Sequence, residues 1–320
     1  MSKKENGLFK KFAVTGAIAG AACAAAGSAF IEQFLSKKGI SKLAAKGGFT
    51  SPEEMECFIN SEEAIAGTEF YRKTVYRDIF TFNKHSKCLH AIFYDAPEKS
   101  DVFVISCHGY MGNPTLNKTY IKHFYEMGFN VLLPYLRGHG KSEHNYCTMG
   151  WLDRLDIIDW IEYIRDLNPK AKIILHGVSM GAATVMMTTG EELPDNVVCC
   201  IEDCGYTTLW DEYSVQLKEF YNLPSDIVLN ILNPIFKMTL GFDIKSASAL
   251  KQVKKSKTPT LFIHGDKDAF VPFWMNYPLY QNASCEKERL VVPGAHHAAS
   301  VYLCPELYWN TVTEFIKKYI

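Results

Sequence analysis

The chain has 320 residues, of which 48% are hydrophobic and 22% charged, a composition typical of a globular protein with a large core. Its 34 basic and 35 acidic side chains leave a formal net charge of −1, which argues against a nucleic-acid partner because phosphate binding requires a basic face. The 10 cysteines form no CxxC pair, and we therefore predict neither a metal site nor a disulfide framework.

The amino terminus carries an apolar stretch, Phe12–Ile31, that is rich in alanine and glycine and has lysines on both sides. At a rise of about 1.5 Å per residue, such a stretch is long enough to span a bilayer. We therefore predict that residues 1–35 are a separate N-terminal segment and that residues 12–31 anchor the protein in a membrane. Two alternatives stay open: a cleaved export signal, and a helix of a cytoplasmic protein, since alanine and glycine are only weakly hydrophobic.

Residues 36–66 are polar and helix-leaning and are predicted to connect this segment to one catalytic domain, residues 67–320. Alternating apolar and polar residues at the start of that domain predict antiparallel strands. Beyond residue 100, helical patterns alternate with short apolar runs that are typical of strands buried on both faces of a parallel sheet. The sequence thus predicts an α/β fold with a mostly parallel central sheet flanked by helices. The apolar runs are Val102–Ile105, Val131–Leu133, Ile173–Leu175, Val197–Val198 and Leu261–Ile263.

One interval, at about residues 207–255, interrupts this alternation. It contains two strongly apolar patches, Leu209–Leu223 and Ile227–Leu240, which prolines separate and interrupt. Extra core packing and a lid over a pocket both account for such a helical insertion. We predict a lid, because the loops at the carboxyl ends of the strands carry the site in a fold of this kind.

The strongest chemical signal is Gly177-Val178-Ser179-Met180-Gly181, which follows an apolar strand pattern and precedes a helical one. In this context G-x-S-x-G predicts a sharp turn that projects the serine hydroxyl into a pocket, with glycines where backbone segments nearly touch. We therefore predict Ser179 as a nucleophile. The backbone N–H of Met180, at the start of the following helix, is predicted to stabilise an oxyanion.

A serine nucleophile needs a base and an orienting carboxylate, which follow in the order acid and then histidine in this kind of fold. A predicted strand at 260–265 ends in a turn with two carboxylates. We predict Asp268 as the acid and assign Asp266 to shaping the turn. The loop after the next predicted strand contains His296 and His297, and both fit the position of the base.

From about residue 88 to its end, the chain resembles the α/β-hydrolase superfamily, particularly bacterial serine hydrolases grouped near the serine aminopeptidases and small carboxylesterases. The resemblance implies that His297 is the base, because the family pattern G-x-G-H-A-x-S aligns on Gly294, Ala298 and Ser300. It implies that the backbone N–H of Tyr110 is the second oxyanion donor, and that His108 and the 137–140 loop are structural. The matching pieces are His108–Gly112, Arg137–Ser142, the serine turn, the Asp268 turn and Gly294–Ser300.

Taken together, these features predict a serine hydrolase that cleaves carboxylic esters through an acyl-serine intermediate and needs no cofactor. The apolar insertion predicts a substrate with a hydrophobic part. A serine peptidase acting on small peptides is the enzymatic alternative. A binding module that kept the fold without catalysis is the alternative of another class.

Overall fold

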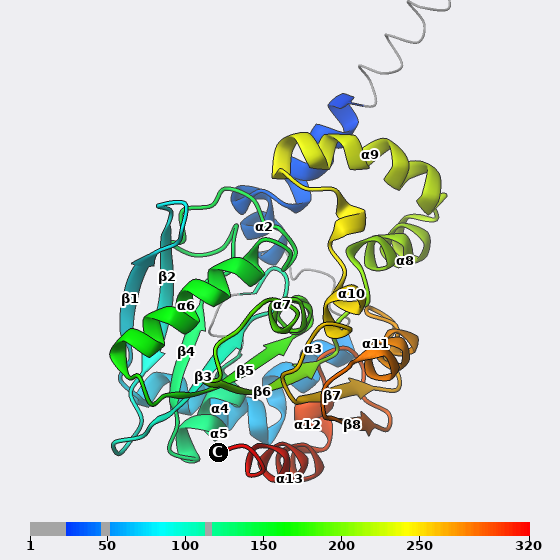
Figure 1. Ribbon diagram of the computed structural model, residues 1–320. Helices are drawn as coiled ribbons and strands as arrows, with labels where there is room; N and C mark the ends of the chain where they lie inside the picture. The colour runs from blue at the N-terminus through cyan, green and yellow to red at the C-terminus, as the bar shows by residue number, and fades with distance from the viewer. Residues whose placement is uncertain (1–23, 46–51, 113–116) are drawn as a thin grey trace, which may run out of the picture.

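The computed structural model describes residues 24–45, 52–112 and 117–320. One sheet of eight strands, in the order β1-β2-β4-β3-β5-β6-β7-β8, forms the centre of the molecule (Figure 1). β1 and β2 pair antiparallel, β2 pairs antiparallel with β4, and the remaining neighbours are parallel. The mostly parallel sheet predicted from the sequence is thus confirmed. The strands are β1 Arg77–Phe82, β2 Cys88–Tyr94, β3 Val102–Cys107, β4 Asn130–Pro134, β5 Lys172–Val178, β6 Val197–Asp203, β7 Thr260–Gly265 and β8 Lys287–Val292.

Helices cover both faces of the sheet because consecutive strand residues face opposite sides and both sides are apolar. In β5, Ile174 packs into the cluster that contains α5 (Lys118–Glu126) and α13 (Pro305–Ile316). Leu175 packs into the cluster on the other face, which contains α6 (Asp153–Leu167) and α7 (Met180–Thr189). The remaining helices of the two faces are α3 Pro52–Asn60, α4 Glu62–Lys73, α10 Ala249–Val253, α11 Asn276–Asn282 and α12 Ser300–Leu303, with the 3₁₀ turn η3 Phe273–Met275.

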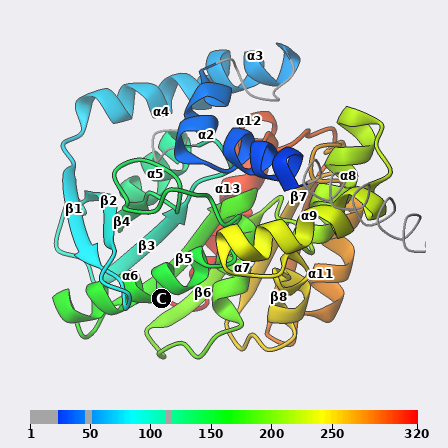
Figure 2. The same cartoon turned by 90° about the horizontal axis from the view of Figure 1, so that it is seen from above.

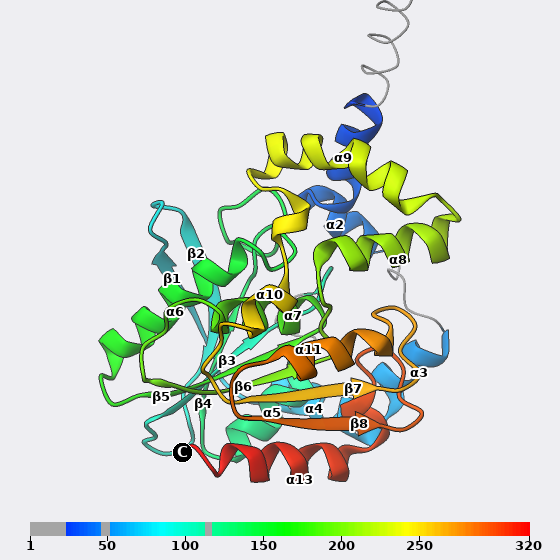
Figure 3. The same cartoon turned by 45° about the vertical axis from the view of Figure 1, so that its right-hand side comes forward.

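The chain between β6 and β7 forms two further helices, α8 (Leu209–Tyr221) and α9 (Ser225–Leu240), followed by the 3₁₀ turn η2 (Ile244–Ser246). These helices stand above the carboxyl ends of the strands (Figures 1 and 3). The Thr208 hydroxyl caps α8 by accepting a hydrogen bond from the N–H of Asp211 at 2.9 Å. α9 ends at Gly241, whose φ of 83° suits glycine.

The described part of the amino terminus packs against the rest of the protein. Residues 24–34 are helical and lie beside α9, and α2 (Lys37–Ala44) follows (Figure 2). Ile31 and Leu35 are each only 1% exposed and belong to the same core cluster as α6 and α9. The helix therefore buries Ile31 within the protein and packs Phe30 and Phe34, which are partly buried, against the same cluster.

This arrangement corrects the prediction that Phe12–Ile31 anchors the protein in a membrane. Residues 12–23 of that stretch lie outside the described residues, and the remainder belongs to the helix that packs beside α9. In the described ranges, none of the helices combines the length and the apolar character needed to cross a bilayer. The prediction of membrane anchoring was wrong because the sequence pattern of Ala, Gly and a few large apolar residues fits a helix packed on its own domain equally well.

Candidate active site

Ser179 lies in a sharp turn between β5 and α7. Its backbone has φ 58° and ψ −118°, a conformation that residues other than glycine rarely adopt. The glycines on either side allow the turn to close. A Cβ on Gly177 would lie 2.2 Å from the carbonyl oxygen of Gly181, and a Cβ on Gly181 would lie 2.1 Å from that of Cys107. A side chain at position 177 would therefore force the turn open, and one at position 181 would push it away from β3.

Three predicted site residues form a hydrogen-bonded series in the loops after β5, β7 and β8. The Oγ of Ser179 lies 2.9 Å from Nε2 of His297, and Nδ1 of His297 lies 2.7 Å from Oδ2 of Asp268. Ser179 and Asp268 are buried, whereas His296 points outward and is exposed. Of the two adjacent histidines, the structure thus brings His297 to Ser179.

The Asp268 carboxylate is held from both sides. Its Oδ1 accepts hydrogen bonds from the backbone N–H groups of Phe270 and Val271, at 3.0 and 2.9 Å. Its Oδ2 lies 3.2 Å from Nε2 of His264 as well as within hydrogen-bond distance of His297. Burial opposes ionisation of Asp268, but the charge and the hydrogen bonds of the two histidines outweigh it and lower its pKa to about 2.

The electrostatics of His297 follow from this partner. Burial acts to lower the pKa of the imidazole, but the charge and the hydrogen bond of Asp268 raise it overall, with further contributions from Glu212 and Asp203. The second turn carboxylate, Asp266, accepts a hydrogen bond from the N–H of Gly294 at 2.7 Å. Asp266 therefore ties the turn after β7 to the loop that carries His297.

The predicted oxyanion donors come from two segments that meet at Ser179. The loop after β3 lies directly against the serine, since a Cβ on Gly109 would be 3.4 Å from the Cβ of Ser179. Tyr110 follows in this loop, and Met180 is the first residue of α7, where backbone N–H groups have no partner within the helix. Both residues line the cavity that contains Ser179.

His108, at the end of β3, links two loops. Its Nε2 accepts a hydrogen bond from the N–H of Leu136 at 3.2 Å, so its Nδ1 carries the proton and donates to the carbonyl of Gly109 at 2.8 Å. Burial lowers the pKa of His108 to about 3. The ring therefore stays neutral and fixes the loop that contains Tyr110, without contacting Ser179 in a hydrogen bond.

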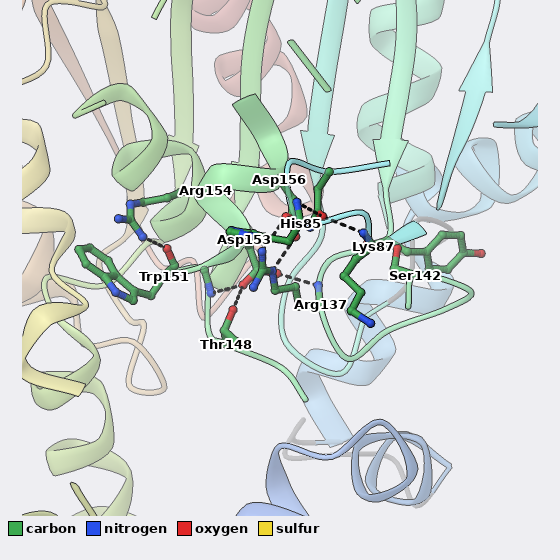
Figure 4. A network of polar contacts seen from close by, with 12 residues as sticks. His85, Lys87, Arg137, Ser142, Thr148, Trp151, Asp153, Arg154 and Asp156 are labelled. Atoms are coloured by element: carbon green, nitrogen blue, oxygen red, sulfur yellow. Dashed lines mark hydrogen bonds and ion pairs between the residues drawn. The ribbon is translucent and has the colours of Figure 1, made fainter. Parts of the chain in front are cut away.

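A buried ion pair fixes the loop after β4 (Figure 4). The guanidinium of Arg137 contacts both carboxylate oxygens of Asp156 in α6, at 2.6 and 2.7 Å, and its backbone N–H donates to Asp153 at 2.7 Å. Asp153 also accepts a hydrogen bond from the Thr148 hydroxyl at 2.6 Å. With two of its guanidinium nitrogens already paired to Asp156, Arg137 holds the loop after β4 against α6.

A largely apolar cavity of about 80 Å³ opens beside Ser179, enough for several water molecules or a short alkyl chain. Three segments enclose it, and we call them the helical wall: residues 24–35, α8 and α9. Their side chains are aromatic or aliphatic for the most part. Those that line the cavity are Phe30, Phe34, Leu35, Glu212, Tyr213, Gln216, Leu217, Tyr221, Leu229 and Leu232.

Among the described residues that line this cavity, Glu212 carries the one carboxyl group. Its Oε1 accepts a hydrogen bond from Nε2 of Gln216 at 2.9 Å, and its Oε2 has no hydrogen-bond partner among the described residues. Burial raises the pKa of Glu212 to about 8, although the charge of His297 opposes this shift. The sequence did not single out Glu212, because an acidic residue in the first turn of a helix is also expected from the helix dipole.

Among the described residues, Cys204, Asp268 and His297 place one ligand atom each within 4.8 Å of one another. Asp268 and both ring nitrogens of His297 already take part in the hydrogen-bonded series with Ser179. Burial also raises the pKa of the Cys204 thiol well above its usual value, whereas metal binding requires the thiolate. These contacts explain the positions of Asp268 and His297 without a metal ion, and Cys204 is a poor metal ligand as a thiol.

Known proteins share this fold. Residues 102–223 match the sequence profile of the alpha/beta hydrolase fold family. An uncharacterised protein of Bacillus subtilis (strain 168), YqkD, is 27% identical over 258 residues, which cover 80% of this chain and 83% of the relative. The thermostable monoacylglycerol lipase of Bacillus sp. (strain H-257) is 24% identical over 241 residues, which cover 69% of this chain and 93% of the lipase.

A solved structure of the Pyrococcus furiosus esterase Pf2001 superposes with a TM-score of 0.64 at 24% identity, over 78% of this chain and 93% of the esterase. The strand order, the turn at Ser179 and these similarities agree with one another. The chain therefore has the α/β-hydrolase fold, and its similarity to a lipase and an esterase supports a hydrolase.

Proposed function

We propose that the protein is a serine hydrolase that cleaves carboxylic esters through an acyl-serine intermediate. The observation that carries this proposal is the hydrogen-bonded series Ser179–His297–Asp268 at the edge of a largely apolar cavity. A serine hydroxyl is a weak nucleophile by itself, and this series supplies the base and the orienting carboxylate that it needs.

In the first half of the reaction, Oγ of Ser179 bonds to the ester carbonyl carbon while Nε2 of His297 takes the hydroxyl proton. Asp268 stabilises the resulting imidazolium, in accordance with its low pKa of about 2. The carbonyl oxygen becomes an oxyanion, and the backbone N–H groups of Met180 and Tyr110 donate hydrogen bonds to it. His297 then gives its proton to the leaving alcohol as the carbon–oxygen bond breaks.

The second half returns the enzyme to its starting state. A water molecule gives a proton to His297 and attacks the acyl carbon of the acyl-serine. The bond to Oγ of Ser179 breaks, the carboxylic acid leaves, and the proton passes from His297 back to the serine. The cavity beside Ser179 accepts the hydrophobic part of the ester, since its lining is mostly aromatic and aliphatic.

The adjacent histidines offer a matched test. We expect His297→Ala to lower kcat for p-nitrophenyl octanoate by at least about 10³-fold, because the serine loses its base. His296→Ala removes an exposed ring one residue away and is expected to retain wild-type activity. Circular dichroism should show both variants folded. Full activity in His297→Ala, or its loss in His296→Ala alone, would contradict the assignment.

A further inference from the structure

The N-terminal helix reaches the cavity beside Ser179, although the two are far apart in the sequence. Phe30, Phe34 and Leu35 line the cavity together with Ser179 and residues of α8 and α9. Figure 2 shows this helix alongside α9, across the top of the sheet. Because the catalytic loops occupy the other side of the cavity, this helix supplies a side of the pocket that no element of the sheet provides.

Aromatic contacts join the helix to the other two segments of the helical wall. The rings of Phe30 and Phe34 lie 4.7 Å apart, and Phe30 also lies 6.2 Å from Phe236 of α9 and 6.5 Å from Tyr213 of α8. Phe34 makes an edge contact with Tyr221 at 6.4 Å. Such offset and edge arrangements are favourable for aromatic rings, so Phe30 and Phe34 have defined positions in the pocket.

At its carboxyl end, the same helix also makes hydrogen bonds to the catalytic domain. The carbonyl of Leu35 accepts a hydrogen bond from the N–H of Cys147 at 2.7 Å. The carbonyl of Phe34 accepts a hydrogen bond from the hydroxyl of Tyr110, in the loop after β3. Together with the burial of Ile31, these contacts fix the positions of Phe30 and Phe34 at the cavity.

We propose that Phe30 and Phe34 are specificity-determining residues that limit the length of the hydrophobic chain that the pocket accepts. This inference rests on the proposed ester hydrolysis, and it identifies residues that select among ester substrates. The cavity holds about 80 Å³, and both rings lie on its surface. Truncating either ring therefore lengthens the cavity, and enlarging one shortens it.

The test uses two opposite changes at one position. Phe34→Ala is expected to raise the ratio of kcat/KM for p-nitrophenyl laurate to that for the butyrate about tenfold, because each methylene that gains a place in the pocket adds to binding. Phe34→Trp is expected to lower the same ratio by a similar factor. Gln33→Ala, an exposed neighbour on the same helix, should leave the ratio unchanged.

A purely structural role predicts a different pattern: Phe34→Ala would lower the melting temperature, and the chain-length ratio would stay at the wild-type value in both variants. That pattern would overturn the proposal. A second readout does not depend on turnover: calorimetric binding of laurate and of butyrate to Ser179→Ala protein, with and without Phe34→Ala. We expect laurate to gain about tenfold in affinity relative to butyrate when Phe34 is truncated.

The two readouts separate the two possible failures. If the wild-type protein hydrolyses no ester but truncation of Phe34 shifts laurate binding, the proposed function fails and the role of Phe34 stands. If the wild-type protein hydrolyses esters but neither the kinetic ratio nor the binding ratio moves, the role of Phe34 is refuted and the proposed function stands.

Discussion

The loops at the carboxyl ends of β5, β7 and β8 meet the helical wall at Ser179, yet the two regions are held in different ways. The loops are fixed by their backbones. Ser179 has a positive φ, the glycines around it leave no space for a Cβ, and backbone N–H groups donate hydrogen bonds to Asp268. The helical wall is fixed chiefly by side chains, such as the rings of Phe30 and Phe236.

This difference has a functional consequence. Backbone constraints tolerate few residue types, so the geometry of the reacting groups is strictly determined. A wall of packed side chains changes its shape with each substitution while the sheet below stays intact. We therefore expect changes in the loops to affect the rate of the reaction, and changes in the wall to affect which substrate is accepted.

The largest effect is expected in the loops. Asp268→Asn keeps the shape of the side chain but removes the charge that orients His297 and stabilises its protonated form, and we expect kcat to fall about 10⁴-fold. Asp266→Asn, two residues away, keeps an oxygen that can accept the hydrogen bond from Gly294. The measurement is kcat for ester hydrolysis by the two purified variants. Comparable losses of kcat in both would show that the shape of the turn, rather than the charge of Asp268, sets the rate.

Removal of residues 1–35 tests the wall as a structural unit. The deletion takes away Ile31 and Leu35, and burial of two such side chains contributes about 3 to 6 kcal/mol to the free energy of unfolding. We expect the melting temperature to fall by about 10 °C and the preference for one chain length to be lost. Differential scanning calorimetry is the measurement. A control that lacks only residues 1–23 retains every described residue of the helix.

An unchanged melting temperature after removal of residues 1–35 would mean that the N-terminal helix contributes nothing to the fold. The helical wall would then consist of α8 and α9 alone, without residues 24–35.

Tyr110, in the loop after β3, links the site to the helical wall: its backbone N–H is the proposed second oxyanion donor, and its hydroxyl donates to the carbonyl of Phe34. Tyr110→Phe removes that hydrogen bond and retains the ring. We expect kcat to fall about tenfold with little change in KM, because a displaced oxyanion donor weakens the transition state rather than substrate binding. The Tyr213 hydroxyl has no hydrogen-bond partner among the described residues, so Tyr213→Phe is the matched control.

Equal kinetics in Tyr110→Phe and Tyr213→Phe would show that the loop after β3 keeps its position without the N-terminal helix. A rise in KM with unchanged kcat would instead place Tyr110 among the residues that only bind substrate.

The smallest effect concerns pH. The pKa of Glu212 is raised to about 8, so its carboxyl is largely neutral at pH 7 and ionises as the pH rises through 8. An apolar chain in the cavity favours the neutral form, and we therefore expect the KM of apolar esters to rise severalfold above pH 8. Glu212→Gln cannot ionise and should show a flat KM between pH 7 and 9. Parallel profiles of wild type and variant would refute this account of Glu212.

The two regions also differ in how much the sequence revealed. Short apolar strand patterns precede Ser179, Asp268 and the pair His296–His297, and they predicted that these residues meet, because parallel strands bring their carboxyl ends to one edge of the sheet. The choice of His297 over His296 came from the family resemblance. A mostly parallel sheet with helices on both faces followed from the same patterns, whereas the order of the strands was not predicted. Local motifs were sufficient because the relevant constraints are local.

The wall was predicted less well because its contacts join distant segments. An apolar stretch at 12–31 predicted a membrane anchor, since hydrophobicity alone does not say whether a helix buries its side chains in lipid or in its own domain. The sequence around Phe30, Phe34 and Glu212 contains no pattern that distinguishes residues lining a pocket from residues of the core. The hydroxyl of Tyr110 was missed because the family resemblance concerned only its backbone N–H.

The central claim is that Ser179 is the nucleophile, and covalent labelling tests it most directly. The native protein would be treated with a fluorophosphonate, and the adduct would be located by peptide mass spectrometry. We predict a single adduct, on Ser179, that forms in the wild type and in His296→Ala but is strongly slowed in His297→Ala. A folded wild-type protein with no adduct, or with an adduct on another residue, would contradict the claim.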